Sequence, residues 1–213
     1  SFDVAMTGLG GHVVSLSWNE MQLGRGETVA DTARVLGRYG DAIMARVYSH
    51  GDLEELAKYA DVPVINGLSD LCHPCQALAD LLTVWEKKGD LQGLKIAYVG
   101  DGTNVCNSLL AGCAQVGADV GVACPEGYEP DAGFVEFARR RGRETGSQIW
   151  VGTDPIKAVR DADVVYTDTL VSMGQESERE KRVQVFVPRY QITQKLLGRA
   201  RKDAIFMHCL PAH

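Results

Sequence analysis

The sequence predicts an α/β protein with two doubly wound parallel-sheet domains. Short β-branched or apolar runs alternate with segments of helical periodicity along the chain. This alternation is typical of βαβ units, in which helices cover both faces of a parallel sheet. Eight expected strands are many for one sheet of this length, and the polar stretch KKGDLQG at 87–93 interrupts the pattern. We therefore expect one domain at residues 1–88, which ends in a helix, and a second at 89–213.

The expected elements follow one another in a regular order. Runs of Val, Ile, Ala and aromatic residues predict strands at 12–17 (HVVSLS), 41–47 (DAIMARV), 63–66 (PVIN), 94–100 (LKIAYVG), 119–124 (DVGVAC), 149–152 (IWVG), 163–168 (DVVYTD) and 204–210 (AIFMHCL). Apolar residues three and four apart predict helices at 28–39, 52–60, 74–88, 104–117, 131–145, 154–161, 177–187 and 192–200. Each strand except the last is followed by a helix, which is the order that parallel pairing requires.

The bulk composition is that of a soluble globular protein. The chain has 213 residues, 45% hydrophobic and 23% charged, which is enough for one large or two modest cores. Its formal charge of −6 argues against a general nucleic-acid surface, because such surfaces need a basic excess. We find no apolar run of about eighteen residues and no signal-peptide pattern. We expect a cytoplasmic protein, or a mitochondrial matrix protein in a eukaryote, with no nucleic-acid or membrane partner.

The chain has six cysteines, at positions 72, 75, 106, 113, 124 and 209, which would be enough for three disulfides. A chain of this size with a real core does not need them. Cys106 and Cys113 lie seven residues apart on an expected helix, and Cys124 ends an expected strand. Buried, reduced thiols are therefore the favoured interpretation.

Polar segments stand at the ends of five expected strands, where ligands collect in parallel sheets. Arg46 ends one strand, and the other four strands are followed by LSDLCHPCQ (68–76), GDGTN (100–104), DTLVSMGQE (168–176) and HCLPAH (208–213). Any single segment would be ordinary as a solvated loop or a helix cap. Five at equivalent positions predict a common site.

The GDGTN turn gives only a weak indication of a dinucleotide-binding protein. The fingerprint G-x-G-x-x-G requires a third glycine, and this position is Val105. Asn104 stands near the expected helix N-terminus instead. Its side chain can cap the helix or, together with free backbone amides, receive a carboxylate. Local evidence leaves these two roles open.

Cys72-His73-Pro74-Cys75 has the spacing of a thioredoxin-type redox centre. That motif normally follows the first strand of a small domain, whereas here two βα units precede it. A zinc site would need a second ligand pair, and the chain has no other Cys-x-x-Cys or His-x-x-x-His. His73 and Gln76 are three residues apart, so both can face one small ligand, which is the favoured reading.

The segments HPCQALAD, DTARVLGRYGDAIMARV, GDGTN, DTLVSMGQE and HCLPAH together resemble the ornithine carbamoyltransferase family, in the same order and spacing. The resemblance implies transfer of the carbamoyl group of carbamoyl phosphate to the δ-amine of L-ornithine. The products would be L-citrulline and phosphate, a step of arginine biosynthesis or of the urea cycle. It also implies that no metal or organic cofactor takes part.

The resemblance also implies roles for site residues. Arg46 and His73 would donate to the carbonyl oxygen as negative charge develops on it. Gln76, with backbone carbonyls of the HCLP segment that includes Leu210, would hold the carbamoyl NH₂. Arg46 could also bind phosphate.

For ornithine, the resemblance assigns the α-carboxylate to Asn104 and the Met173 backbone, and the α-amine to Asp168 with Ser172. Cys209 would lie near the δ-amine. A thiolate or a carboxylate could accept the proton of this amine, and the sequence does not distinguish them. The loop that contains Ser172 and Met173 would close over ornithine and exclude water.

The resemblance further implies a homotrimer with active sites between subunits. A loop matching MQLGRGE (21–27) would reach the neighbouring site through Gln22, although its glycines are also typical of a solvated loop. The family's Ser-Thr-Arg-Thr-Arg segment would precede Ser1, and its last helix would follow His213. We therefore expect the chain to lack both terminal segments of the family and to be inactive alone.

The alternatives are a transcarbamylase for another amine, such as putrescine, acetylornithine or aspartate, and an inactive homologue. Asp168 favours an amino group over aspartate's second carboxylate. Putrescine would leave Asn104 without a partner. The presence of Arg46, His73 and Cys209 argues against an inactive homologue.

Overall fold

The computed structural model describes residues 1–17, 21–171, 176–210 and 212. It is an α/β protein, as predicted, with a two-stranded and a five-stranded sheet. The chain divides into two compact units. The first comprises Ser1–Met44 and Gly51–Ile65, and the second comprises Ala45–His50 and Asn66–His213. No helix in the described part of the chain is long and apolar enough to cross a membrane.

The N-terminal part of the chain contains α1 (Phe2–Gly8), the 3₁₀ helix η2 (Gln22–Arg25), α2 (Val29–Leu36), β1 (Ile43–Arg46), α3 (His50–Tyr59) and β2 (Val64–Leu68). The order β1, α3, β2 is a βαβ unit, and β1 pairs with β2. Helix α2 begins where its sequence predicts, because the Thr28 side chain accepts a hydrogen bond from the Asp31 backbone N–H at 3.1 Å.

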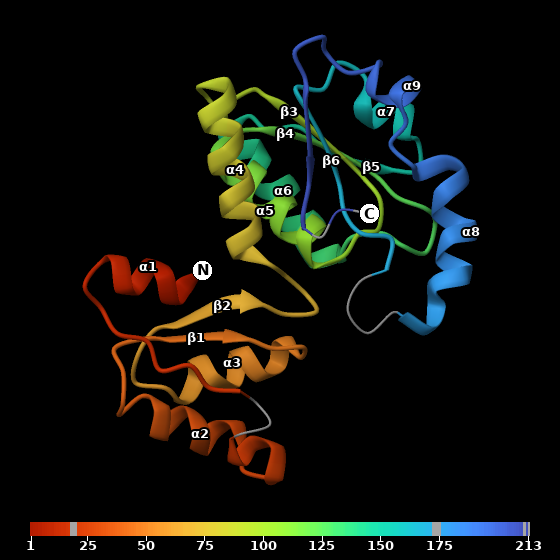
Figure 1. Ribbon diagram of the computed structural model, residues 1–213. Helices are drawn as coiled ribbons and strands as arrows, with labels where there is room; N and C mark the ends of the chain where they lie inside the picture. The colour runs from red at the N-terminus through yellow and green to blue at the C-terminus, as the bar shows by residue number, and fades with distance from the viewer. Residues whose placement is uncertain (18–20, 172–175, 211, 213) are drawn as a thin grey trace. The chain divides into compact units, whose positions relative to one another are not determined.

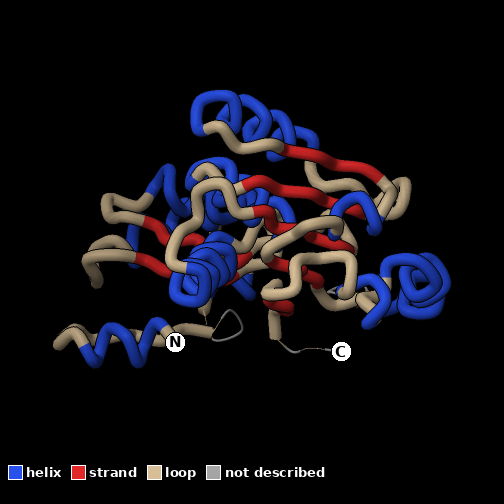
Figure 2. Tube along the Cα trace, turned by 90° about the horizontal axis from the view of Figure 1, so that it is seen from above, coloured by secondary structure: helices blue, strands red, loops and turns tan. Residues whose placement is uncertain are grey.

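The five-stranded sheet of the second unit has the order β5-β4-β3-β6-β7, and all of its pairs are parallel. Its strands are β3 (Lys95–Val99), β4 (Asp119–Ala123), β5 (Ile149–Gly152), β6 (Val164–Thr167) and β7 (Ile205–His208). Figure 2 shows the strands side by side. The chain builds outward from β3 through β4 and β5, then returns to add β6 and β7 on the other side. The switch point therefore lies between β3 and β6, where ligands bind in such folds.

Helices cover both faces of this sheet (Figure 1). One face carries α4 (Pro74–Lys88), α5 (Asn104–Val116) and α6 (Ala132–Thr145), and the other carries α7 (Pro155–Val159), α8 (Arg179–Tyr190) and α9 (Gln194–Leu197). Successive residues of β3 alternate between the two cores, because strand side chains point to opposite faces. Ile96 and Tyr98 pack in the first core, and Ala97 and Val99 in the second. The second unit is therefore doubly wound, as predicted.

The predicted strand at 12–17 is wrong. These residues form no strand, and Val14 is 68% exposed. The run has high β-propensity, but a strand also needs a hydrogen-bonding neighbour, and no described strand pairs with it. The first sheet consequently has two strands in the described residues, where the sequence predicted three.

Helix α8 extends beyond its predicted end at residue 187, through Pro188 to Tyr190. Proline removes one backbone donor, but near the end of a helix this affects few bonds. Phe186 and Tyr190 lie one turn apart with ring centroids 6.2 Å apart, and both are buried. Their packing against the sheet stabilises the last turn.

Candidate active site

The turns after β3, β6 and β7 lie at neighbouring strand ends around the switch point. The turn after β3 is the GDGTN segment. A side chain at Gly102 would collide with the Pro130 backbone, and the Gly102 N–H donates to the Tyr128 carbonyl at 2.9 Å. This glycine therefore serves a close approach between two backbones, which explains its presence without a bound dinucleotide.

Asp168 is the centre of the polar contacts at these strand ends. Its Oδ1 accepts hydrogen bonds from the Cys209 Sγ at 2.7 Å and from the Thr169 backbone N–H at 2.6 Å. Its Oδ2 accepts from the Thr103 hydroxyl at 3.3 Å. The strand ends of β6, β7 and β3 thus converge on one buried carboxylate, as the sequence predicted for Asp168 and Cys209.

Cys209 is a thiol at neutral pH. Burial raises its pKa to about 12, and the negative charge of Asp168 acts in the same direction. The thiol accordingly donates to the carboxylate. Of the two candidates for accepting a proton, the carboxylate is the one with free acceptor capacity.

His73 is the N-cap of α4, and Pro74 occupies the first helical position. The His73 Nδ1 is buried and has no hydrogen-bond partner among the described residues. Burial lowers the pKa of His73, and the charge of Arg46 lowers it further, whereas Asp168 raises it. The lowered pKa favours the neutral imidazole at neutral pH.

Helix α5 holds the loop that carries His73. The Asn104 Nδ2 donates to the Ser69 carbonyl at 2.7 Å, and the Asn107 Nδ2 donates to the Leu71 carbonyl at 2.9 Å. The Ser108 hydroxyl accepts from the His73 backbone N–H at 2.7 Å. These three α5 side chains, spaced at i, i+3 and i+4, share one helix face.

Asn107 and Ser108 were not predicted as site residues. Both are buried, and Asn107 also accepts a hydrogen bond from the Asp131 backbone N–H at 2.9 Å. The sequence feature that could have indicated them is a pair of polar residues within an otherwise apolar helical segment. It does not identify the partners, which lie in other segments.

Asn104 does not cap α5. Thr103 is the N-cap residue and Asn104 the first helical residue, and the Asn104 amide is bound to Ser69. The capping alternative is therefore excluded in this structure, while the predicted contact with a carboxylate remains a prediction.

The Cys72-x-x-Cys75 pair has structural contacts of its own. The Asn66 side chain donates to the Cys72 Sγ at 3.1 Å, and the Cys75 Sγ donates to the Asn66 carbonyl at 3.2 Å. Burial raises the pKa of both thiols, whereas a redox centre needs an accessible thiolate. All six cysteines are free, and Cys106, Cys113 and Cys124 are buried as predicted.

Among the residues that the structure describes, the remaining predicted ones make no side-chain hydrogen bond to Asp168. Gln76 lies in the first turn of α4, where its side chain contacts Asp80. Leu210 follows β7 and its side chain is 86% exposed. Gln22 is exposed in η2 of the first unit. Ser172 and Met173 lie outside the described residues.

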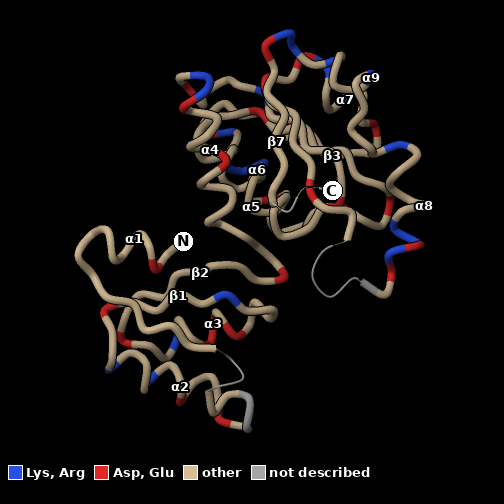
Figure 3. The backbone as a smooth tube through the Cα atoms, viewed as in Figure 1, with Lys and Arg blue, Asp and Glu red and all other residues tan. Residues whose placement is uncertain are grey.

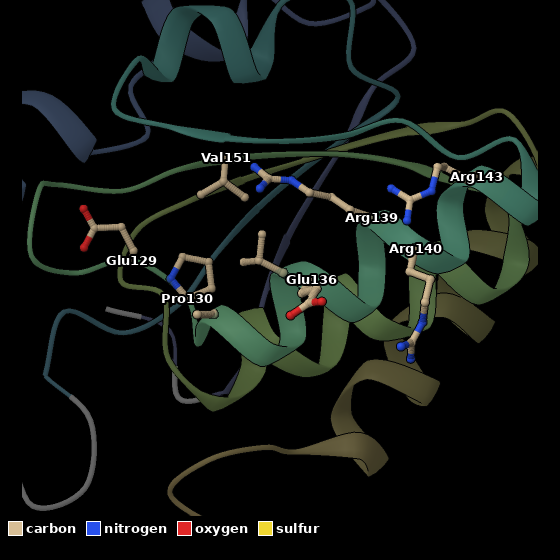
Figure 4. Close-up of a pocket in the computed structure, with 9 residues that line it drawn as sticks. Glu129, Pro130, Glu136, Arg139, Arg140, Arg143 and Val151 are labelled. Atoms are coloured by element: carbon tan, nitrogen blue, oxygen red, sulfur yellow. The ribbon is translucent and has the colours of Figure 1, made fainter.

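A separate surface pocket of about 530 Å³ lies beside α6 (Figure 4). It is lined by Glu129, Pro130, Ala132, Val135, Glu136, Arg139, Arg140, Arg143 and Val151, so it contains none of the predicted site residues. Its charged residues are exposed and of both signs. Figure 3 shows the same interspersion of acidic and basic residues along both units.

Both parts of the chain match family models. Residues 1–86 match the carbamoyl-phosphate-binding domain of aspartate/ornithine carbamoyltransferases, and residues 92–213 match the Asp/Orn-binding domain. The chain therefore belongs to the aspartate/ornithine carbamoyltransferase family.

Individual relatives are named ornithine carbamoyltransferase. The protein from Pyrococcus horikoshii is 59% identical over 213 residues, which covers 100% of this chain and 67% of the relative. The Bacillus subtilis protein is 54% identical, and the match covers 100% of this chain and 66% of the relative. The solved structure of ornithine carbamoyltransferase from Pyrococcus furiosus is similar to this chain with a TM-score of 0.94 and 58% identity. The match covers 100% of this chain and 67% of that chain. The chain thus spans about two thirds of the length of these relatives.

Proposed function

We propose that the protein transfers the carbamoyl group of carbamoyl phosphate to the δ-amine of L-ornithine, giving L-citrulline and phosphate. The observation that carries this proposal is the cluster at the switch point. There, the Cys209 thiol donates to the buried Asp168 carboxylate. The charges of Asp168 and of Arg46, at the end of β1, both act on the pKa of His73. The names of relatives with 59% identity support ornithine as the amine.

In the proposed reaction the neutral δ-amine attacks the carbonyl carbon, a C–N bond forms, and the C–O bond to phosphate breaks. Negative charge develops on the carbonyl oxygen during the attack. Arg46 supplies a permanent cation for this charge, and His73 supplies a neutral N–H donor. The lowered pKa of His73 supports the neutral form.

The attacking amine must lose a proton. Because the Cys209 thiol has a pKa of about 12, it does not supply a thiolate at neutral pH. We assign acceptance of this proton to the Asp168 carboxylate. Cys209 then has the role of holding Asp168 in place.

The family membership supports the roles that we propose for the remaining site residues. Asn104 and the Met173 backbone bind the α-carboxylate, and Asp168 with Ser172 binds the α-amine. Gln76 and the Leu210 backbone carbonyl hold the carbamoyl NH₂. The reaction as proposed uses no metal or organic cofactor.

We also propose the organisation of the whole protein. A carbamoyl-phosphate domain at 1–88 and an ornithine domain at 89–213 are supported by the family matches at 1–86 and 92–213. The assembly is a cytoplasmic homotrimer in which Gln22 reaches the neighbouring subunit's site. The molecular mass of the full-length protein in solution tests the trimer, and a monomeric active enzyme would contradict it.

The function is tested with the protein at the full length of its relatives. The carbamoylated product is measured after incubation with carbamoyl phosphate and one amine at a time: ornithine, acetylornithine, putrescine or aspartate. We expect citrulline from ornithine at a rate far above any product from the other amines. A preference for another amine, or no product with any, would overturn the assignment.

A further inference from the structure

Within the described part of the chain, the Gln76 side chain makes one hydrogen bond, and the direction of that bond orients the amide. The Gln76 Nε2 donates to the Asp80 Oδ1 at 2.9 Å, one turn along α4. A carboxylate has only acceptor sites, so a charged Asp80 can bind only the nitrogen end of the amide. The Gln76 Oε1 is then directed away from Asp80 and remains available as an acceptor.

Asp80 has no role in the proposed reaction, yet it is only 5% exposed. Burial raises the pKa of Asp80, and the hydrogen bond from Gln76 opposes this rise. Burying a carboxylate is costly unless it is paired. Its Oδ2 has no hydrogen-bond partner among the residues that the structure describes. Among the described residues, the Gln76 amide is therefore the side chain that hydrogen-bonds this buried carboxylate.

The surroundings of Asp80 hold it in place. The Tyr166 ring from β6 stacks on Tyr98 with centroids 5.9 Å apart, and Tyr166 acts to lower the pKa of the Asp80 carboxyl. Leu81, the next residue of α4, packs in the same core. An amide bound to such a fixed carboxylate is oriented before any ligand arrives.

We propose that Asp80 is a positioning residue that orients the Gln76 amide with its oxygen toward the carbamoyl NH₂. The inference rests on the proposed function, which assigns Gln76 to the carbamoyl group. The NH₂ of carbamoyl phosphate donates, so only the oxygen end of Gln76 can bind it. A reversed amide would place two donor groups against each other.

This arrangement also separates carbamoyl phosphate from acyl phosphates of similar shape. Acetyl phosphate carries a methyl group where carbamoyl phosphate carries NH₂, so it leaves the Gln76 oxygen without a donor. A site built to hydrogen-bond a ligand group rejects analogues that lack that group. Asp80 thereby contributes to the choice of phosphate donor.

The test uses Asp80→Asn in the full-length protein. Asparagine has nearly the same shape, but its NH₂ can donate to the Gln76 oxygen and turn the amide around. We expect kcat/KM for carbamoyl phosphate to fall by about ten- to a hundredfold, as for one misdirected hydrogen bond. The inhibition constant of acetyl phosphate against carbamoyl phosphate should change by less than about twofold, because acetyl phosphate has no NH₂ that could hydrogen-bond Gln76. Glu86→Gln, an exposed change on the same helix, is the matched control and should change neither value.

A double-mutant cycle separates positioning from general damage. In a Gln76→Ala background, Asp80→Asn should lower kcat/KM by no more than about twofold, because its effect passes through Gln76. Equal losses in both backgrounds, or parallel weakening of acetyl phosphate, would overturn the proposal. If Asp80→Asn does not fold, Asp80→Ser is measured in its place with the same expectations.

The same double-mutant cycle can be measured on the free energy of unfolding. This measurement tests the pairing of Asp80 with Gln76 independently of enzymatic activity. If no citrulline forms, the function fails, but the pairing of Asp80 with Gln76 can still be measured. A coupling between the two substitutions in unfolding supports the pairing. Additive effects would contradict it.

Discussion

The backbone N–H of His73 donates to the Ser108 hydroxyl at 2.7 Å, although the two residues are 35 positions apart. Ser108 comes from α5, and His73 begins α4. The backbone that carries the proposed imidazole donor is therefore held by a second helix. The His73 carbonyl accepts from the backbone N–H groups of Gln76 and Ala77, whereas its own N–H has no helical acceptor and is fixed by Ser108.

We expect Ser108→Ala in the full-length protein to lower kcat by about ten- to a hundredfold through misplacement of His73. Ornithine KM should change less, since Ser108 touches no proposed ornithine contact. The measurement is steady-state citrulline formation, with the exposed Gln115→Ala of the same helix as control. Unchanged kcat in Ser108→Ala would show that the contact does not position His73.

Cys209 gives a pH-dependent prediction. Its folded-state pKa of about 12 lies above the ordinary value of 9.0, so the folded state keeps a proton that the unfolded state loses. The stabilisation is complete below pH 9.0 and is lost as the pH rises toward about 12. Wild type should lose up to about 1.4 kcal/mol of unfolding free energy per pH unit in this range relative to Cys209→Ser. Chemical denaturation at pH 8, 9 and 10 measures this difference, and parallel curves for the two proteins would contradict the raised pKa.

Arg182 is 2% exposed and pairs with Asp101 while its Nε donates to the Leu170 carbonyl. We expect Arg182→Ala to lower the free energy of unfolding by about 3–5 kcal/mol, because it leaves a buried carboxylate without its partner. Arg179→Ala, an exposed change on the same helix, should cost less than about 0.5 kcal/mol. Equal effects of the two substitutions in urea denaturation would refute the structural role of Arg182.

Cys72 and Cys75 are predicted not to form a redox pair. Burial raises the pKa of both thiols, and Asn66 holds both sulfurs. Cys72→Ser and Cys75→Ser should therefore each leave citrulline turnover within about twofold of wild type, as for changes outside the chemistry. Thiol counting by mass spectrometry after mild oxidation is the second check, and a reversible Cys72–Cys75 disulfide would revive the redox interpretation.

The parts of the fold that the sequence predicted well depend on local patterns. The strands β3 to β7 and the helix α4 were predicted because hydrophobic periodicity and flanking glycines are local signals. The strand expected at 12–17 failed because its formation depends on a partner elsewhere. The contact between Asp168 and Cys209 agrees with the expectation that the ends of parallel strands meet at one edge, while the roles of both residues stay predictions.

The residues that the sequence did not reveal act through distant partners. Asn107 and Ser108 bind backbone groups 36 and 35 residues away. Arg182 binds Asp101 across 81 residues and carries no motif. Asp80 contacts Gln76 within one helical turn, but only its burial against the sheet separates this pair from an ordinary surface contact.

The central claim is that Arg46 and His73 stabilise the oxygen of the carbamoyl group during its transfer to ornithine. The most direct measurement is kcat for citrulline formation by Arg46→Ala and His73→Ala in the full-length protein, with folding checked by circular dichroism. We predict that each substitution lowers kcat by about two to three orders of magnitude, with a smaller change in ornithine KM. Turnover close to wild type in both variants would contradict the account.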